Sequence, residues 1–421
     1  DPYEIVPVKD EIGHGTNVAG IAAAKGVRTE ITGAAPGSSL AIVKAIPVRK
    51  VTRDYFAIYG DAPAYKNTII FLAIKYLYEF AAKVNKPMVI CLPMGSTFGS
   101  HEGTSFVERY INEISTFSGI AVVVPTGNEG NSGIHTSGKI RYTGDVQIIE
   151  LRVGKNQKNI RFEIWISKPD KVAISLKSPT GEVIRRIAPK KKEVVDVKFV
   201  YENTEMIIEY LIPEEISGDE KISIYAKNLK EGIWQFNLIG DLIVVGNYHA
   251  YLLQKELLAP DTAFVDPTVE TTLTVPGTAE RIICAASYNQ NNNTIVPSSG
   301  NGYTRKGIVK PDIAAGGIGQ LTTTPGGGTK VISGTGVASA VTAGCIALLL
   351  QWGIVEGNDI TMYASKIQTY LIRGVERRPG DVYPNPQWGY GILNMKGVFD
   401  NIRMVRSKNE YYAGNLFVRL P

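Results

Sequence analysis

The sequence is poor in cysteine and histidine and has little excess charge. It holds 3 cysteines and 4 histidines in 421 residues. Cys91, Cys284 and Cys345 each lie in an apolar run, without the spacing of a metal site or a disulfide framework. We therefore expect three buried thiols, no bound metal and no cofactor.

The charge pattern argues against a nucleic-acid partner. The net charge of +5 is small for this length, and the densest basic run, Lys190 to Lys192, is followed directly by Glu193. No aromatic or arginine cluster accompanies the run, so it is typical of a solvated hairpin tip. No apolar stretch reaches the length of a membrane span, and no signal peptide is visible.

The first part of the chain alternates between two hydrophobic periods. Apolar strands and amphipathic helices are predicted in turn, with strands at 39–48, 87–92 and 119–124 and helices at 12–25, 66–84 and 101–117. Such alternation indicates a parallel sheet of seven or a similar number of strands, covered by helices on both faces.

The period changes to two near residue 140. Short strands separated by turn residues are predicted at 161–166, 171–176, 205–211, 221–225 and 234–239. The α/β pattern then returns with a strand at 281–287 and helices near 335–352 and 361–373. We therefore predict an α/β core in two segments, 1–141 and 259–421, with an antiparallel β-sandwich or jelly roll inserted at 142–258.

Three separated motifs carry side chains or backbone suited to chemistry. Residues 13–20 (GHGTNVAG) place His14 at a helix start, where it can act as a general base. Residues 125–130 (PTGNEG) place Asn128 at the carboxyl end of a strand, where its amide can donate to an oxyanion. Residues 333–344 (SGTGVASAVTAG) begin a small-residue helix whose first amides can face a cleft.

In this order the three motifs resemble those of the subtilisin-like serine peptidases. Residues 33–36 (GAAP), 92–96 (LPMGS) and 310–316 (KPDIAAG) resemble further family segments. The resemblance covers roughly residues 10–140 and 258–400. It implies that His14 holds the position of the base and Asn128 that of the oxyanion donor. Gly336 would then stand where the family has its nucleophilic serine.

Two departures from the family pattern bear on catalysis. Gly336 has no side chain to attack or to hold an acyl group. Ser339 lies one helical turn further on, about 5 Å away along the helix, which near-attack geometry does not tolerate. The family's acidic triad member precedes its histidine by some tens of residues, and Asp1 and Asp10 do not lie in that context. The sequence leaves open whether this aspartate precedes residue 1 in a longer protein or never existed.

The inserted sandwich gives a narrower resemblance. Together with residues 99–105 (GSHEGTS), 349–354 (LLQWGI) and 387–391 (QWGYG), it is similar to the Csp subtilases of clostridial spores. That resemblance implies an inactive subtilase in the cortex or coat region of the spore. Its expected partners are other Csp proteins or a germination regulator, a small-molecule germinant, and its own prodomain if one is encoded upstream. Two alternatives remain: an active processing protease whose serine has been replaced, and a purely structural coat component.

Overall fold

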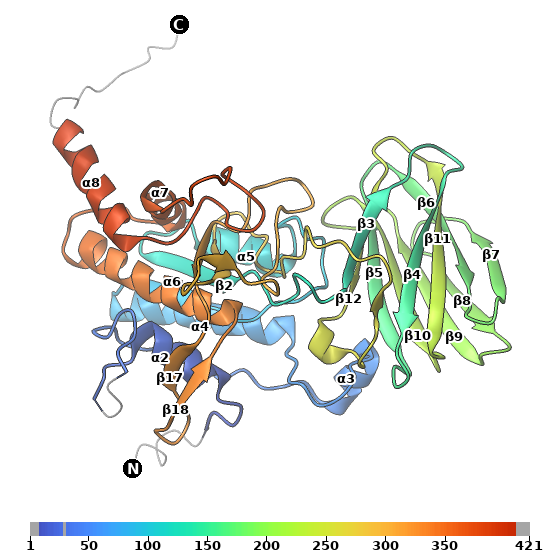
Figure 1. The fold of residues 1–421 in the computed structure, drawn as a ribbon, viewed down its shortest axis with the longest axis horizontal. Helices are drawn as coiled ribbons and strands as arrows, with labels where there is room; N and C mark the ends of the chain where they lie inside the picture. Colours follow the sequence, from blue (N-terminus) through green and yellow to red (C-terminus); the bar gives the residue numbers. More distant parts are fainter. Residues whose placement is uncertain (1–7, 28–30, 410–421) are drawn as a thin grey trace, which may run out of the picture.

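A computed structural model of the chain describes residues 8–27 and 31–409. It contains an α/β core and a β-sandwich that is inserted into it, side by side along the long axis of the molecule (Figure 1). The confirmed fold class is therefore a subtilisin-like parallel-sheet core with an inserted antiparallel domain. Asp1 lies outside the described residues.

The sheet of the core has five strands in the described part of the chain, fewer than the seven expected. Four of them are parallel and neighbour one another in the order β1 (Met88–Cys91), β2 (Ile120–Pro125), β14 (Ile283–Asn289) and β16 (Ile313–Gly316). The short strand β15 (Thr294–Ile295) pairs antiparallel with β14. All six residues of β2 are buried, as expected for a central strand that is covered on both faces.

Successive residues of β2 contact helices on opposite faces of the sheet. Val122 and Val124 pack in one cluster with α4 (Asn67–Val84) and α5 (Phe106–Ile114). Ala121 and Val123 pack in another cluster on the opposite face. The helices of that second face are α6 (Thr335–Leu350), α7 (Ala364–Gly374) and α8 (Met395–Asn409).

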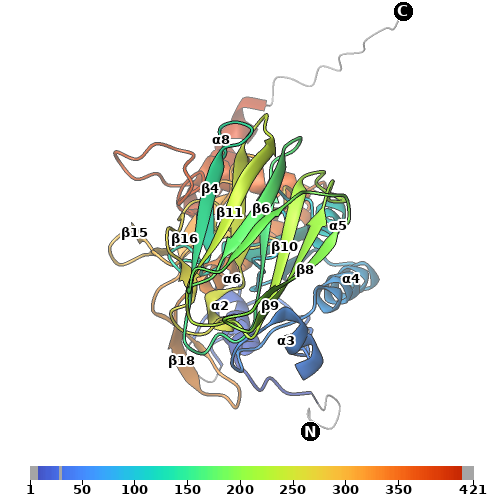
Figure 2. The same ribbon diagram turned by 90° about the vertical axis from the view of Figure 1, so that its right-hand side faces the viewer.

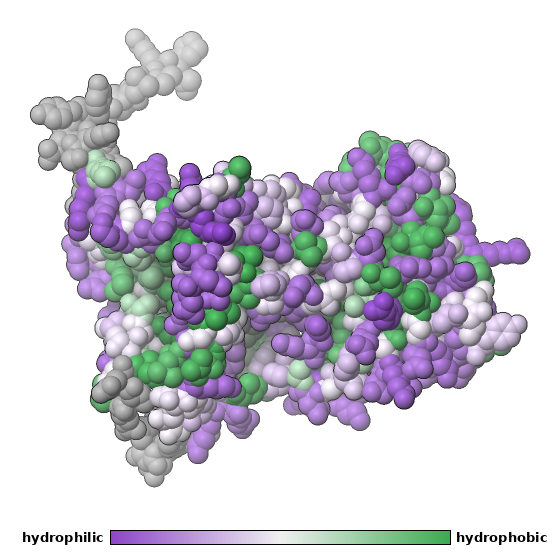
Figure 3. Space-filling model, viewed as in Figure 1, coloured by the Kyte–Doolittle hydropathy of each residue, from purple (hydrophilic) through white to green (hydrophobic). Residues whose placement is uncertain are grey.

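Three shorter elements complete the core. They are α2 (His14–Ala23), α3 (Lys50–Phe56) and the hairpin of β17 (Gln320–Thr323) and β18 (Thr329–Ile332). Hydrophobic residues gather over the β17–β18 hairpin in Figure 3, in agreement with the exposure of Leu321 and Val331.

Two predicted elements of the first segment differ from the structure. The helix expected at 101–117 begins only at Phe106, because Ser105 and Glu108 form a capping box that fixes its first turn there. The strand expected at 39–48 is absent, and its apolar residues Leu40, Ile42 and Ile46 are exposed. An apolar alternation becomes a strand only beside a pairing partner, and no described strand pairs with this segment.

The insertion consists of two antiparallel sheets packed face to face (Figure 2). The six-stranded sheet has the order β3 (His135–Lys139), β12 (Asn247–Leu252), β5 (Ile160–Ile166), β10 (Glu220–Lys227), β9 (Thr204–Leu211) and β8 (Val194–Phe199). The five-stranded sheet has the order β13 (Ala263–Phe264), β4 (Val146–Val153), β11 (Gly232–Leu242), β6 (Lys171–Lys177) and β7 (Val183–Ile187).

Successive side chains of β5 point to opposite faces of the six-stranded sheet, and each face has a different neighbour. Phe162 and Ile164 belong to the core of the sandwich, where Phe162 meets Phe236 edge to face at 5.0 Å. Glu163 and Trp165 point to the opposite face, which lies against the α/β core: Glu163 accepts from the Gly99 amide of the core. The sheet is thus covered on both faces at β5, whereas β8 leaves Val194, Asp196 and Lys198 exposed. The face of the sheet that meets the core, called its outward face below, carries polar side chains such as Glu163.

The long helical stretch Thr335–Val355 corrects the expectation about membrane-spanning length. It joins α6 to the π-helical turn Gln351–Val355, and it is long and apolar enough by composition to cross a bilayer. Most of this stretch is buried inside the protein, in the manner of a core helix. Its apolar composition therefore serves packing against the central sheet.

The basic run is exposed, as predicted, but it is not a hairpin tip: it connects β7 of the five-stranded sheet to β8 of the six-stranded sheet, and Lys190 pairs there with Glu193 at 3.0 Å. We predict that Lys191→Glu changes the free energy of unfolding by about 0.5 kcal/mol or less, because the site is on the surface. Phe162→Ala in the sandwich core should cost about 3–5 kcal/mol. Urea denaturation of both variants measures the difference, and a loss of several kcal/mol at Lys191 would contradict the assignment.

Candidate active-site cleft

His14 is the first residue of α2, and the loop before it is held by Asp10. One oxygen of Asp10 accepts from the Gly13 amide at 2.8 Å. The other accepts from the Thr16 amide at 3.0 Å and the Thr16 hydroxyl at 2.7 Å. Gly13 itself has a φ of +86°, which favours glycine. Asp10 is therefore a cap for α2, which agrees with its sequence context outside the family's triad position.

Asn128 follows β2 and is fixed by the start of α6. Its Oδ1 accepts from the Thr335 amide at 3.1 Å and from the Thr335 hydroxyl at 2.9 Å. The side-chain oxygen of Asn128 is therefore bonded to the start of α6. Its Nδ2 group has no hydrogen-bond acceptor among the described residues. The exposed side chain thus keeps a donor beside the first turn of α6.

Gly336 is the second residue of α6 and lies beside the ring of His14. A Cβ built on Gly336 would lie 3.5 Å from His14 Nε2 and 3.7 Å from the Cβ of Pro93. Any side chain at this position would therefore meet the imidazole directly. The structure brings the three residues singled out from the sequence together at one place, since Asn128 bonds to the residue before Gly336.

Ser339 does not face this cleft. Its side chain is fully buried, and its hydroxyl donates to the Gly336 carbonyl at 2.8 Å. Its other neighbour is Cys91, whose sulfur lies 4.0 Å from the hydroxyl oxygen. Burial raises the pKa of the Cys91 thiol to about 12, so this thiol is unreactive as well.

The local charges act on His14 in opposite directions. Desolvation by the surrounding walls lowers the pKa of His14, while the carboxylates of Asp10 and Glu256 raise it. Partial burial would raise the pKa of Asp10, but hydrogen bonds from Thr16 and Gly13 outweigh it and hold that pKa below its usual value. At neutral pH the ring of His14 is therefore neutral and can accept a proton.

A segment that the sequence did not single out also contacts the cleft. The return linker, residues 253–258, leads from β12 of the insertion back to the core. Gln254 donates from Nε2 to the Gly95 carbonyl at 2.6 Å, and the Lys255 amide donates to Glu129 at 3.3 Å. Burial raises the pKa of Glu129. These contacts join residues more than 100 positions apart, so no local pattern could have predicted them.

The described residues contain no group of three or more His, Cys, Asp or Glu side chains that could hold a metal ion.

The geometry agrees with a comparison against protein families. The model of the subtilase family matches residues 1–157 and 242–391, which is well over half of the chain. The chain belongs to the subtilase family. The gap in the match falls on the inserted sandwich, from β5 to the end of β11.

Among solved structures, the chain is similar to the CspB protease of Clostridium perfringens. The two share 30% identity and a TM-score of 0.85, over 96% of this chain and 84% of that one. The prenylagaramide maturation protease PagA shares 25% identity over 31% of this chain and 45% of its own, with a TM-score of 0.27. Sphericase shares 15% identity over 92% of this chain and 78% of its own, with a TM-score of 0.46. No curated protein sequence matches the chain.

We predict that Gly336→Ala stabilises the protein by roughly 0.5–1 kcal/mol, because alanine restricts the unfolded chain and its Cβ makes only ordinary contacts here. Gly344, in the same helix, is the matched control. A Cβ there would lie 2.5 Å from the Cβ of Ala34, so Gly344→Ala should destabilise by about 1–3 kcal/mol. Thermal unfolding of both variants tests this, and a large loss at Gly336 would show that packing requires the glycine.

Proposed function

We propose that this chain is a catalytically inactive Csp-type subtilase that regulates spore germination by binding a partner. The observation that carries the proposal is Gly336, the residue that faces His14 Nε2. A serine peptidase needs a hydroxyl at this point, both to attack the carbonyl and to hold the acyl group afterwards. Glycine supplies neither function, and the buried Ser339 hydroxyl is already bonded to the helix backbone.

What the cleft retains is suited to binding. Asn128 offers an amide donor, and the first turn of α6 adds the partial positive charge of a helix N-terminus. Such groups recognise a carbonyl oxygen or a carboxylate without any covalent step. Asp10 caps α2, so it is not free to orient the ring of His14.

The biological setting of the proposal rests on similarity to the CspB protease. A chain of this type is expected in the cortex or coat region of the spore. Its partner would be another Csp protein, a germination regulator, a small-molecule germinant or its own prodomain. Turnover is not required for any of these roles, since each depends on binding alone.

We predict that the wild-type chain does not react with a fluorophosphonate probe, because labelling needs a serine nucleophile. Gly336→Ser should label only slowly. The new hydroxyl would lie beside His14, but no described carboxylate accepts a hydrogen bond from that ring, and a triad whose histidine is not oriented by an aspartate loses about 10⁴ in turnover. Ser339→Ala is the control, and wild-type labelling that disappears in this variant would refute the proposal. Rapid labelling of Gly336→Ser would indicate a triad that is complete except for its nucleophile, and would favour a replaced serine.

Loss of the gene separates a regulator from a structural coat component. We expect spores without the protein to fail to germinate while keeping normal morphology, because a regulator acts on a signal and not on the bulk of the coat. The measurement is the loss of optical density after germinant addition, with electron microscopy of the same spores. Normal germination with an altered coat would contradict the regulatory role.

A further inference from the structure

Three of the four histidines lie between the core and the insertion, away from the cleft. His135 on β3 and His249 on β12 belong to the outward face of the six-stranded sheet, and His101 comes from the core loop before α5. The ring of Tyr251 stacks on His101 at 3.8 Å and on His135 at 4.5 Å. The four rings form one column across the junction.

His135 and His249 are hydrogen-bonded directly to each other. Nε2 of His135 lies 3.1 Å from Nδ1 of His249, and Nδ1 of His135 lies 3.1 Å from the Thr268 carbonyl. The carbonyl only accepts, so His135 donates from Nδ1, and its Nε2 must then accept from His249. Both rings are neutral in this arrangement. A proton on each ring would place two N–H groups against each other, so the pair cannot hold both charges.

His101 differs from this pair. Its two ring nitrogens face the carbonyls of Leu273 at 2.8 Å and Thr97 at 2.9 Å. Two carbonyl acceptors suit a protonated ring, although burial lowers the pKa of His101 to about 4. Protonation of His101 therefore leaves its hydrogen bonds intact, whereas double protonation of the His135–His249 pair breaks theirs.

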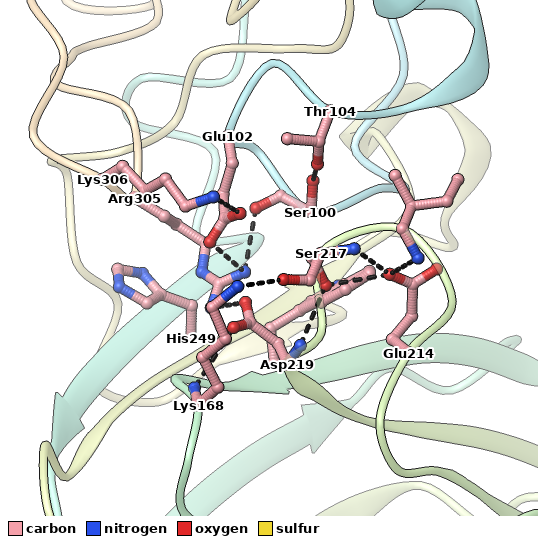
Figure 4. A network of polar contacts seen from close by, with 12 residues as sticks. Ser100, Glu102, Thr104, Lys168, Glu214, Ser217, Asp219, His249, Arg305 and Lys306 are labelled. Atoms are coloured by element: carbon pink, nitrogen blue, oxygen red, sulfur yellow. Dashed lines mark hydrogen bonds and ion pairs between the residues drawn. The ribbon is translucent and has the colours of Figure 1, made fainter.

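A buried cation adds to the cost of charging the pair. Arg305 is 1% exposed and pairs with Asp219 of the insertion at 3.0 Å and with Glu102 of the core at 3.6 Å. Figure 4 shows His249 beside this network, and the charge of Arg305 disfavours a proton on either ring.

The other charged groups at the junction have their own partners. Lys306 pairs with Glu102 at 2.7 Å, and Lys221 pairs with Glu163 at 3.3 Å. Glu163 also accepts from the indole of Trp165 at 3.1 Å. None of these carboxylates forms an ion pair with His135 or His249 in the described structure.

The pair is connected to the cleft through β12. This strand ends at Leu252 and continues directly into the return linker, where Gln254 bonds to Gly95 and Lys255 bonds to Glu129. Movement of β12 away from the core would withdraw these contacts from the cleft.

We propose that the His135–His249 pair is an acid-sensitive lock: while neutral, it ties β12 to β3 and keeps charge away from the buried Arg305 of the core, so that the return linker stays in place. Protonation of both rings breaks this bond and sets two like charges beside Arg305, which pushes β12 from the core and frees the edge of the cleft at Gly95. The lock depends on the neutral pair and does not depend on whether the cleft is catalytic.

The direction of the pH dependence follows from the two states. Burial lowers the pKa of His135 to about 3 and that of His249 well below its usual value, whereas open rings titrate at roughly 6.5. The open state therefore binds protons first as the pH falls. The lock is fully formed above about pH 6.5 and is lost progressively as the pH decreases toward about 3.

Hydrogen–deuterium exchange on the full chain tests the lock, with labelling times scaled for the intrinsic exchange rate at each pH between 7.5 and 4.5. Opening exposes His101 as well as the pair, so it takes up as many as three protons, and protection of β3 and β12 relative to β2 should decrease by up to about 1000-fold per pH unit. In His249→Asn, which keeps a side-chain N–H donor, the limit should fall to about 100-fold per unit. His14→Gln, which changes the one histidine outside the junction, should leave the wild-type slope unchanged.

Two outcomes would overturn the proposal. One is an equal slope in wild type and His249→Asn. The other is a slope that disappears in Glu102→Gln, which would assign the acid response to the carboxylates around Arg305. If His249→Asn does not fold, ¹⁵N chemical shifts of the wild-type rings decide. A neutral His135 protonated at Nδ1 at pH 6 supports the lock, and ordinary titration of both rings near pH 6.5 refutes it.

Discussion

The arrangement of the two parts of the molecule depends on the buried side chain of Arg305. This guanidinium comes from the core, donates to the Ser100 carbonyl at 2.9 Å and pairs with Asp219 of the insertion. It also lies over the ring of Trp165, 5.5 Å from the ring centre. Removing one partner of such a buried pair typically costs about 3–5 kcal/mol, because the remaining charge is left without compensation. The ion pair is therefore less a source of net stability than a constraint on where the insertion can sit.

That constraint has consequences at a distance. Once Asp219 is tied to Arg305, the six-stranded sheet can present only one face to the core, and that face carries Glu163, His249 and Tyr251. Burial lowers the pKa of the neighbouring imidazoles, and the same positive charge adds to that effect. A neutral pair can form the hydrogen bond between His135 and His249, and this bond holds the strand that leads to the cleft. One buried cation thus influences both the placement of the insertion and the environment of Gln254 at the edge of the cleft.

The parts of the molecule that could be predicted from the sequence are those set by local chemistry. Buried strands such as β2 are visible as apolar runs, and the change to period two marks the sandwich. His14, Asn128 and Gly336 could be predicted to meet because each lies at the end of a strand or the start of a helix, on one edge of a parallel sheet.

The features that could not be predicted depend on contacts between distant parts of the chain. The strand expected at 39–48 has the right alternation but no described neighbour to pair with, and pairing is a property of the whole sheet. The histidine column joins residues from three places in the chain, and its register depends on how β3, β12 and a core loop are placed. The contact of Gln254 with Gly95 likewise follows from the return path of the insertion and has no local signal.

The presence of subtilase-type residues around the cleft does not by itself argue for catalysis, because most of these residues also have structural roles. Asn128 Oδ1 is an acceptor for the first turn of α6, and Asp10 caps α2. Gly130 has no room for a side chain, since a Cβ there would lie 2.1 Å from the Ser299 carbonyl. These residues would be retained for folding whether or not the protein turned over a substrate. Gly336 is the exception: it is helical, its φ is not positive, and a Cβ there would make only ordinary contacts with His14 and Pro93. Since packing does not demand glycine at this position, the choice of residue there bears on the chemistry proposed for the cleft and not on the fold.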